Sequence, residues 1–253
     1  YATTFNIGDL SNWNTSNVTN MYFMFGGVGG DSTILSIGDL SNWDTSKVIC
    51  MNSMFYNCSN LASFSGSFTN LTNIETEAFY CCGSLGEFKA ASALREIGAR
   101  AFYGCSGITE ITIPDSCVLV EFCAFSGCYS LEEVKLSNNM GLIDESTFEG
   151  CRSLKYVDLP TKLVKIGRRA FKGCSSLSFM ILPATLKEIG FDAFADCTSL
   201  SDVTISEGVE KINSSKGEET AFENLVNGHW GGTGMMTNIT FDDKLYDVNG
   251  NAV

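Results

Sequence analysis

A step of 23 residues recurs through the middle of the chain and limits its fold more than any other feature of the sequence. A phenylalanine marks each step, a cysteine follows three residues later, and an aliphatic residue comes three residues after that. The phenylalanines are Phe79, Phe102, Phe125, Phe148, Phe171 and Phe194. Repeats of about 20 to 50 residues are typical of solenoids, in which each coil buries its apolar face only against neighbouring coils. The register therefore predicts a stack of coils.

The segment 97–114 shows how one coil is expected to fold. Ile108, Ile111 and Ile113 follow the spacing L-x-x-L-x-L, and the last two alternate as residues of a short strand do. Pro114 follows directly, and proline ends a strand because it has no N–H to donate to the ladder. A short strand is therefore predicted before each such proline.

The other side of the coil carries Ala101, Phe102 and Cys105. Their spacing places them on one face of a single helical turn. The predicted fold class is therefore α/β: a leucine-rich-repeat solenoid with one short strand per coil in a continuous parallel sheet, and short helical turns or loops on the opposite side.

The chain has 11 cysteines, and most of them follow the repeat. Equivalent residues of stacked coils form a ladder, and disulfides would require neighbouring thiols to pair off and distort that even spacing. Cysteine also behaves as a small buried apolar residue. We therefore expect reduced core thiols at Cys58, Cys82, Cys105, Cys128, Cys151, Cys174 and Cys197.

Four cysteines lie outside this ladder: Cys50, Cys81, Cys117 and Cys123. Cys123 stands where other repeats have Arg100 and Arg169, so it is expected to face solvent. A disulfide between Cys117 and Cys123 remains open from the sequence.

The two ends of the chain differ from its middle. Residues 1–70 carry a second repeat with a step of 30, in which the motif of residues 7–18 returns at 37–48. Residues 71–241 hold the 23-residue repeats, with an insertion predicted at 223–235. Residues 242–253 are predicted to be a cap or the start of a following segment, since terminal coils must shield the core. No linker separates these parts, so one continuous solenoid is expected.

The charge balance of the 253 residues bears on partners. A net charge of −13 disfavours nucleic acid and anionic membrane surfaces, because both need a positive field. The acidity is explained either by solubility or by a cationic partner. The sequence contains no apolar run long enough to span a bilayer and no leader, and we expect the chain to be a mature or trimmed fragment that begins inside a repeat.

The sequence offers little for catalysis or for a cofactor. His229 is the single histidine and lies in a glycine-rich segment, so a Ser-His-Asp or Cys-His arrangement lacks support. No Cys-x-x-Cys pair or histidine cluster has the spacing of a zinc site. The glycine-rich residues 231–234 lack the lysine of a phosphate-binding loop, and residues 247–251 lack the glutamate of a calcium-binding loop. We therefore expect neither enzymatic activity nor a cofactor or metal.

The exposed face of the predicted sheet is more informative. Most positions between the buried strand residues are polar, but Tyr156, Phe179 and Ile181 break this rule on adjacent coils. Clustered exposed apolar side chains on a rigid sheet are typical of an interface. Alternatively, stacking neighbours or curvature hide them. The candidate partner-binding residues are Lys135, Tyr156, Asp158, Phe179, Ile181 and Asp202.

The motifs A-F-x-x-C-x-x-L-x-x-ϕ-x-ϕ-P and D-L-S-N-W-[ND]-T-S-x-V-x-x-M-x-x-M-F, from about Ile7 to Phe241, resemble the BspA-like leucine-rich repeat family. This resemblance implies a bacterial surface or secreted protein, with several members acting as adhesins. It implies no catalytic residues and no fixed ligand motif.

The resulting hypothesis is a non-enzymatic adhesin or recognition module outside the cell, binding a protein or glycoprotein on a host or bacterial surface. The alternative is a structural spacer that presents another domain away from the cell.

Overall fold

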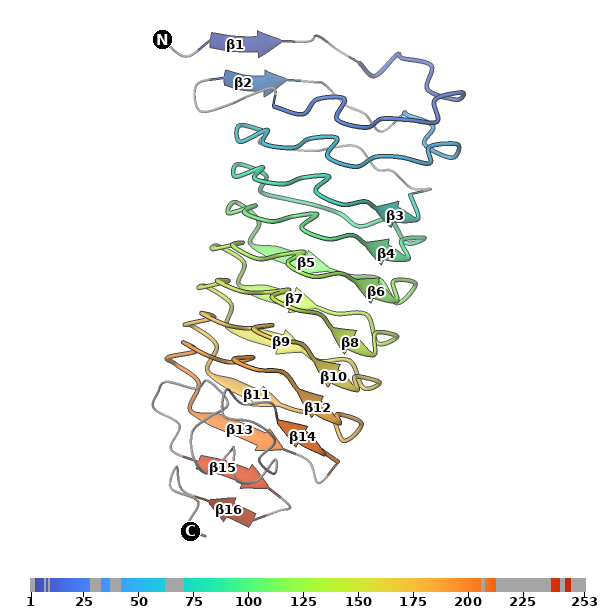
Figure 1. Ribbon diagram of the computed structural model, residues 1–253. Helices are drawn as coiled ribbons and strands as arrows, with labels where there is room; N and C mark the ends of the chain where they lie inside the picture. Colours follow the sequence, from blue (N-terminus) through green and yellow to red (C-terminus); the bar gives the residue numbers. More distant parts are fainter. Residues whose placement is uncertain are drawn as a thin grey trace.

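The chain folds into an elongated stack of coils (Figure 1). The computed structural model describes residues 3–6, 8, 10–27, 33–36, 42–61, 71–205, 208–212, 238–241 and 244–246. Within these residues every regular element is a strand, and the coils otherwise consist of turns and extended segments. The predicted parallel-strand solenoid is confirmed, whereas the helical part of the α/β class is absent from the described residues.

One column of strands includes the three that the sequence predicts before Pro114, Pro160 and Pro183. It forms two sheets, the first made of β5 (Glu110–Thr112), β7 (Glu133–Lys135) and β9 (Tyr156–Asp158). The second contains β11 (Phe179–Ile181), β13 (Asp202–Ile205), β15 (Asn238–Phe241) and β16 (Lys244–Tyr246). All pairings are parallel except that of β15 with β16.

A second column of two-residue strands corrects the prediction of one strand per coil. It forms one sheet from β3 (Asn73–Ile74), β4 (Glu96–Ile97) and β6 (Leu119–Val120). Its other sheet contains β8 (Leu142–Ile143), β10 (Lys165–Ile166), β12 (Glu188–Ile189) and β14 (Lys211–Ile212). The strands therefore form several short sheets and not the single continuous sheet that the sequence predicts. Figure 1 shows the two columns of strands running side by side along the stack.

The N-terminal coils keep their step of 30 residues. β1 (Thr3–Asn6) pairs in parallel with β2 (Thr33–Ser36), Thr3 being opposite Thr33. The rings of Trp13 and Trp43 stack with centroids 6.2 Å apart, and the buried Trp43 donates from Nε1 to the carbonyl of Leu10 at 2.9 Å. The repeated tryptophan thus joins successive coils.

Of the short helical turns or loops that the sequence predicts, the segment between the two strand columns forms non-helical turns. The N–H of Phe102 donates to the carbonyl of Ala124, and that of Gly104 to Ser126, each in the next coil at 2.8 Å. An α-helix instead requires bonds to the residue four positions earlier in the same segment. Arg100 and Gly104 have φ values of 53° and 71°, and these left-handed residues break the helical path.

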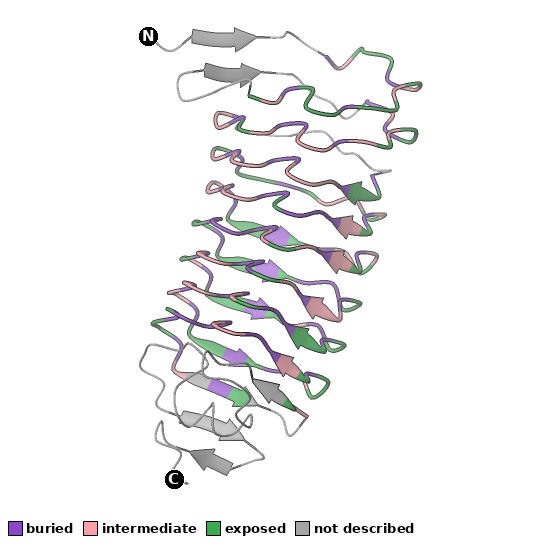
Figure 2. Ribbon diagram, viewed as in Figure 1, coloured by how far each residue is buried: buried purple, intermediate pink, exposed green. Residues whose placement is uncertain are grey.

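A row of stacked phenylalanine rings forms the centre of the core. The ring centroids of successive coils lie 5.2–5.6 Å apart, and Figure 2 shows buried residues along the stack. The rings are those of Phe25, Phe55, Phe79, Phe102, Phe125, Phe148, Phe171 and Phe194. The predicted stacking register is therefore confirmed.

The predicted cysteine ladder is also confirmed, because all seven of its thiols are buried and free. Cys123, which the sequence places toward solvent, is half-buried and only partly exposed. The bridge between Cys117 and Cys123 that the sequence left open is not formed, because both cysteines are free. The predicted insertion 223–235 lies outside the described residues, and of residues 242–253 only β16 is described.

Candidate functional site

The predicted apolar cluster lies on β9 and β11, at the outer surface of the solenoid. Within each strand, the middle residue (Val157 or Met180) is buried and its neighbours point outward. Tyr156 is 44% exposed, Phe179 41% and Ile181 67%. The alternative that neighbouring coils hide these side chains is therefore wrong.

The two aromatic rings of this cluster contact each other across the coil boundary. Tyr156 and Phe179 have ring centroids 5.5 Å apart with an interplanar angle of 36°. β9 belongs to the first sheet of its column and β11 to the second, so the cluster spans the boundary between two sheets. We call Tyr156, Phe179 and Ile181 the sheet patch.

Charged residues border the sheet patch on one side. Lys135 and Asp158 stand opposite each other in the parallel ladder of β7 and β9, and both are exposed. The backbone of Asp202 is in register with Phe179, but its side chain lies outside the described residues. Five of the six predicted residues therefore lie together on neighbouring strands. The sixth, Asp202, lies on the next strand, with its backbone opposite Phe179.

A second surface feature, which the sequence-based prediction does not include, lies on the turn side of the coils. The residue after the ladder phenylalanine is tyrosine in three successive coils: Tyr56, Tyr80 and Tyr103. Their rings stack with centroids 4.8 and 4.9 Å apart and interplanar angles of 7° and 6°. In the next coil the same place is taken by Ser126. We call the three rings the tyrosine stack.

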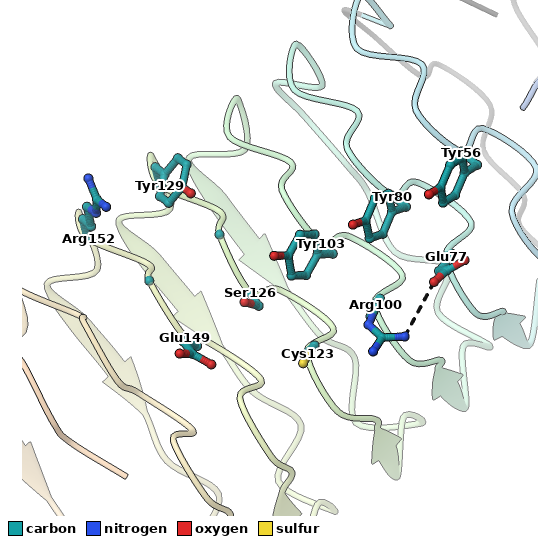
Figure 3. A pocket seen from close by; sticks show the side chains of 12 residues that line it. Tyr56, Glu77, Tyr80, Arg100, Tyr103, Cys123, Ser126, Tyr129, Glu149 and Arg152 are labelled. Atoms are coloured by element: carbon teal, nitrogen blue, oxygen red, sulfur yellow. Dashed lines mark ion pairs between the residues drawn. The ribbon is translucent and has the colours of Figure 1, made fainter. Parts of the chain in front are cut away.

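A cleft of about 650 Å³ runs along the tyrosine stack and past its end (Figure 3). All three tyrosines and Glu77 line it, together with the small residues Ser126, Gly127 and Gly150. Ser126 lies at its centre, with Tyr103 on one side and Glu149 on the other. Arg100 and Arg152 also line it.

Both arginines of the cleft are held by neighbours. Arg100 pairs with Glu77 at 3.7 Å across one coil step and lies 5.1 Å from the centroid of the Phe122 ring. Arg152 lies 5.0 Å from the centroid of the Tyr129 ring. Such cation–π contacts orient a guanidinium without neutralising its hydrogen-bond donors. The cleft thus has two oriented donor groups.

The sequence carried a signal for this cleft. The tyrosines and Ser126 keep the 23- or 24-residue step of the repeat, so a column aligned one position after each phenylalanine shows three aromatic residues followed by a small one.

The cleft shows no activated nucleophile. Burial raises the pKa of the Cys123 thiol above its usual value, so the thiol remains protonated near neutral pH. Burial also raises the pKa of Tyr80. Among the described residues no group of three or more His, Cys, Asp or Glu side chains could hold a metal ion. His229 and residues 231–234 and 247–251 lie outside the described residues.

Among the described residues, no helix is long and apolar enough to cross a bilayer.

Family profiles match most of the sequence. The BspA type leucine rich repeat region, with six copies, matches residues 47–178 and 95–227. A Mycoplasma protein family of unknown function, DUF285, matches residues 1–90. No curated protein matches the chain.

Solved structures with a similar fold come from several bacteria. A leucine-rich repeat protein from Eubacterium ventriosum has a TM-score of 0.58 and 16% identity, over 81% of this chain and 66% of that one. One from Bacteroides ovatus has a TM-score of 0.45 and 21% identity, over 83% of this chain and 55% of that one. This chain therefore spans little more than half the length of the latter. At this identity, the similarity to the Eubacterium protein shows the fold.

Proposed function

Because this chain belongs to the BspA type leucine-rich repeat family, we propose that it is a non-enzymatic recognition module that binds a macromolecule outside the cell or at its surface. The sheet patch is the surface that binds the partner. The partner is a protein or a glycoprotein of a host or bacterial surface. Extracellular placement is an expectation that the family resemblance carries.

The exposure of the sheet patch is the observation that carries this proposal. Three large apolar side chains on adjacent strands are 41–67% exposed, while the middle residues of the same strands are buried. Burying such a cluster against a partner gains about 25 cal/mol for each Å² of apolar surface removed from water. Tyrosine and phenylalanine are also frequent at the energetic centres of interfaces.

The surroundings of the sheet patch suit recognition of a protein. Lys135 and Asp158, together with the exposed Glu133 opposite Tyr156, supply charges of both signs at its border. These charges would fix the orientation of a partner more than they would add affinity. The net charge of −13 favours a partner with a positive surface and disfavours nucleic acid.

The regular core favours a second candidate function, that of a structural spacer. The phenylalanine rings stack without interruption from Phe25 to Phe194, so the described coils form a continuous rod. A spacer needs such a rod but no exposed apolar cluster, and for that reason we rank recognition first.

A pull-down with this chain as bait tests the two functions against each other. Extracellular fractions of candidate host and bacterial cells are offered to the chain and to a Tyr156→Ser/Phe179→Ser/Ile181→Ser variant. The matched control is Ile49→Ser/Val118→Ser/Val164→Ser, which removes three exposed apolar side chains elsewhere. A recognition module retains a defined protein that is lost only with the sheet-patch variant. Retention of no specific protein would contradict recognition and favour the spacer.

A further inference from the structure

The tyrosine stack is closed at one end and open at the other. Within it each ring covers the face of its neighbour, and at the far end the ring of Phe23 lies 5.9 Å from that of Tyr56. At the near end Ser126 follows Tyr103, so one face of the Tyr103 ring borders the cleft (Figure 3). A ligand can therefore stack on a single aromatic face here.

The position of Ser126 lies one step of the repeat beyond Tyr103. The tyrosine rings repeat every 4.8–4.9 Å because the coils do, and a ring at the place of Ser126 would continue this spacing. The ring of Tyr129 closes one side of the space in the cleft: its atoms lie 3.7–3.9 Å from the positions that side chains at Gly127 and Gly150 would occupy. The small residues Ser126 and Gly127, which are buried, and the half-buried Gly150 thus form the floor of the cleft.

The charges around the space decide what kind of ring fits. The guanidinium groups of Arg100 and Arg152 can donate hydrogen bonds, and the carboxylate of Glu149 accepts them. A cationic ligand would meet the two arginines, and an anionic ligand would meet Glu149. A neutral ring with several hydroxyl groups can use all three, because each hydroxyl both donates and accepts.

We propose that this cleft binds one pyranose ring of a neutral glycan. The C–H groups on the apolar face of the sugar lie against the Tyr103 ring, whose π face is negative and attracts weakly positive hydrogens. The hydroxyl groups bond to Ser126, Glu149 and the arginines. The site is separate from the sheet patch and does not depend on the function proposed for it.

Saturation-transfer NMR and calorimetry on the whole chain test this proposal. The probes are the neutral methyl pyranosides of glucose, galactose, mannose and N-acetylglucosamine, with glucuronate and glucosamine as charged comparisons. At least one neutral probe is expected to bind with millimolar affinity and to bind at least tenfold more tightly than either charged sugar. Saturation transfer is expected to be strongest at the C–H groups of one face. If no neutral probe binds, or if a charged sugar binds best, the proposal is wrong.

Ser126→Tyr is the decisive variant because it fills the space with a fourth ring of the stack. It is expected to weaken binding of the neutral probe at least tenfold. Glu149→Gln alters only the half-buried acceptor and is expected to weaken it about three- to tenfold, so the proposal stays testable even if Ser126→Tyr fails to fold. Tyr156→Ser, on the sheet patch, should leave sugar binding unchanged. Undiminished binding in Glu149→Gln or in folded Ser126→Tyr would overturn the proposal.

A final comparison separates a free saccharide from a glycan carried on a protein. A glycoprotein bearing the preferred sugar is offered to the chain before and after enzymatic removal of its glycans. Loss of binding on deglycosylation, matched by loss in Ser126→Tyr, supports a protein-borne glycan. If the free sugar binds and the glycoprotein does not, the cleft takes the free saccharide.

Discussion

The thiol of Cys128 donates a hydrogen bond to the backbone carbonyl of Phe102, one coil earlier, at 3.2 Å. The same carbonyl accepts the N–H of Cys105 at 3.1 Å, so it has two donors although it is buried. Equivalent thiol bonds of 3.0–3.2 Å join the other ladder cysteines to a phenylalanine carbonyl of the preceding coil. The recurring cysteine is therefore explained by a hydrogen bond between coils as well as by its small size.

Replacing Cys128 by alanine should destabilise the protein by about 1–2 kcal/mol. The change removes the thiol bond and leaves a small cavity where the sulfur was. Cys123→Ala, at a half-buried thiol outside the ladder, is the control and should cost less than about 0.5 kcal/mol. Urea unfolding followed by circular dichroism measures both. Equal costs for the two variants would contradict the structural role of the thiol bond.

Stability should fall as the pH rises above 9. Burial raises the pKa of Cys128 from its usual 9.0 to about 12, and that of Cys197 also to about 12. Below pH 9 these thiols are protonated in both the folded and the unfolded chain, so their full contribution to stability is present. Between pH 9 and 12 only the unfolded chain releases these protons, and stability is progressively lost. The slope is about 1.4 kcal/mol per pH unit for each such thiol.

Urea unfolding between pH 8 and 11 measures this slope. Cys128→Ala removes one titrating thiol and should reduce the slope of stability against pH by about 1.4 kcal/mol per pH unit. A variant slope equal to that of the wild type would show that Cys128 does not contribute to the pH dependence.

All 11 cysteines should be free thiols. Titration with a thiol reagent in denaturant, without reductant, should give the full count, because none of the 11 cysteines forms a disulfide in the structure. In the native protein the ladder thiols should react far more slowly than the half-buried Cys50, Cys81 and Cys123. Fewer than seven free thiols would refute the reduced ladder.

Gly167→Ala should destabilise the protein by about 2–3 kcal/mol. A Cβ at this position would lie 2.7 Å from the backbone carbon of Asp144 and from the backbone nitrogen of Glu145, so the two coils would have to move apart. Gly86→Ala is the matched control, since a Cβ there has no atom within 4 Å and its φ is not left-handed. Thermal unfolding compares them, and the control should be neutral or slightly stabilised. A similar stability for the two variants would be evidence against close approach of the coils.

Much of the fold could be predicted because the repeat specifies contacts between coils. Once Phe102 and Phe125 were aligned by their step, the stacked core followed, as did the outward direction of Tyr156 and Phe179 from the alternation of strand residues. These inferences need only the period and the geometry of a strand.

The turn side could not be predicted in the same way. Arg100 adopts a left-handed conformation that the residue type does not favour, and it is held there by its N–H bond to Phe122 of the next coil at 3.1 Å. The spacing of Ala101, Phe102 and Cys105 in the sequence fits a helical turn as well as it fits the non-helical turn that forms. Hydrogen bonds between coils decide the outcome, and the local spacing does not contain them.

The cleft beside Tyr103 could not be predicted for the same reason, because it depends on contacts between coils. Each of Tyr103, Ser126 and Glu149 is ordinary at a turn position when read within its own repeat. Only the stacking of three coils brings them together, so that Tyr103 supplies a ring face, Ser126 a floor and Glu149 a hydrogen-bond acceptor.

The affinity of the sheet-patch variant for the captured partner tests the central functional claim most directly. Calorimetric titration compares the wild type with Tyr156→Ser/Phe179→Ser/Ile181→Ser, and urea unfolding is recorded for both proteins. Because the replaced side chains are exposed, the unfolding midpoint should hardly change, whereas the loss of three anchors should weaken binding at least a hundredfold. An unchanged affinity in a folded variant would contradict recognition through this surface.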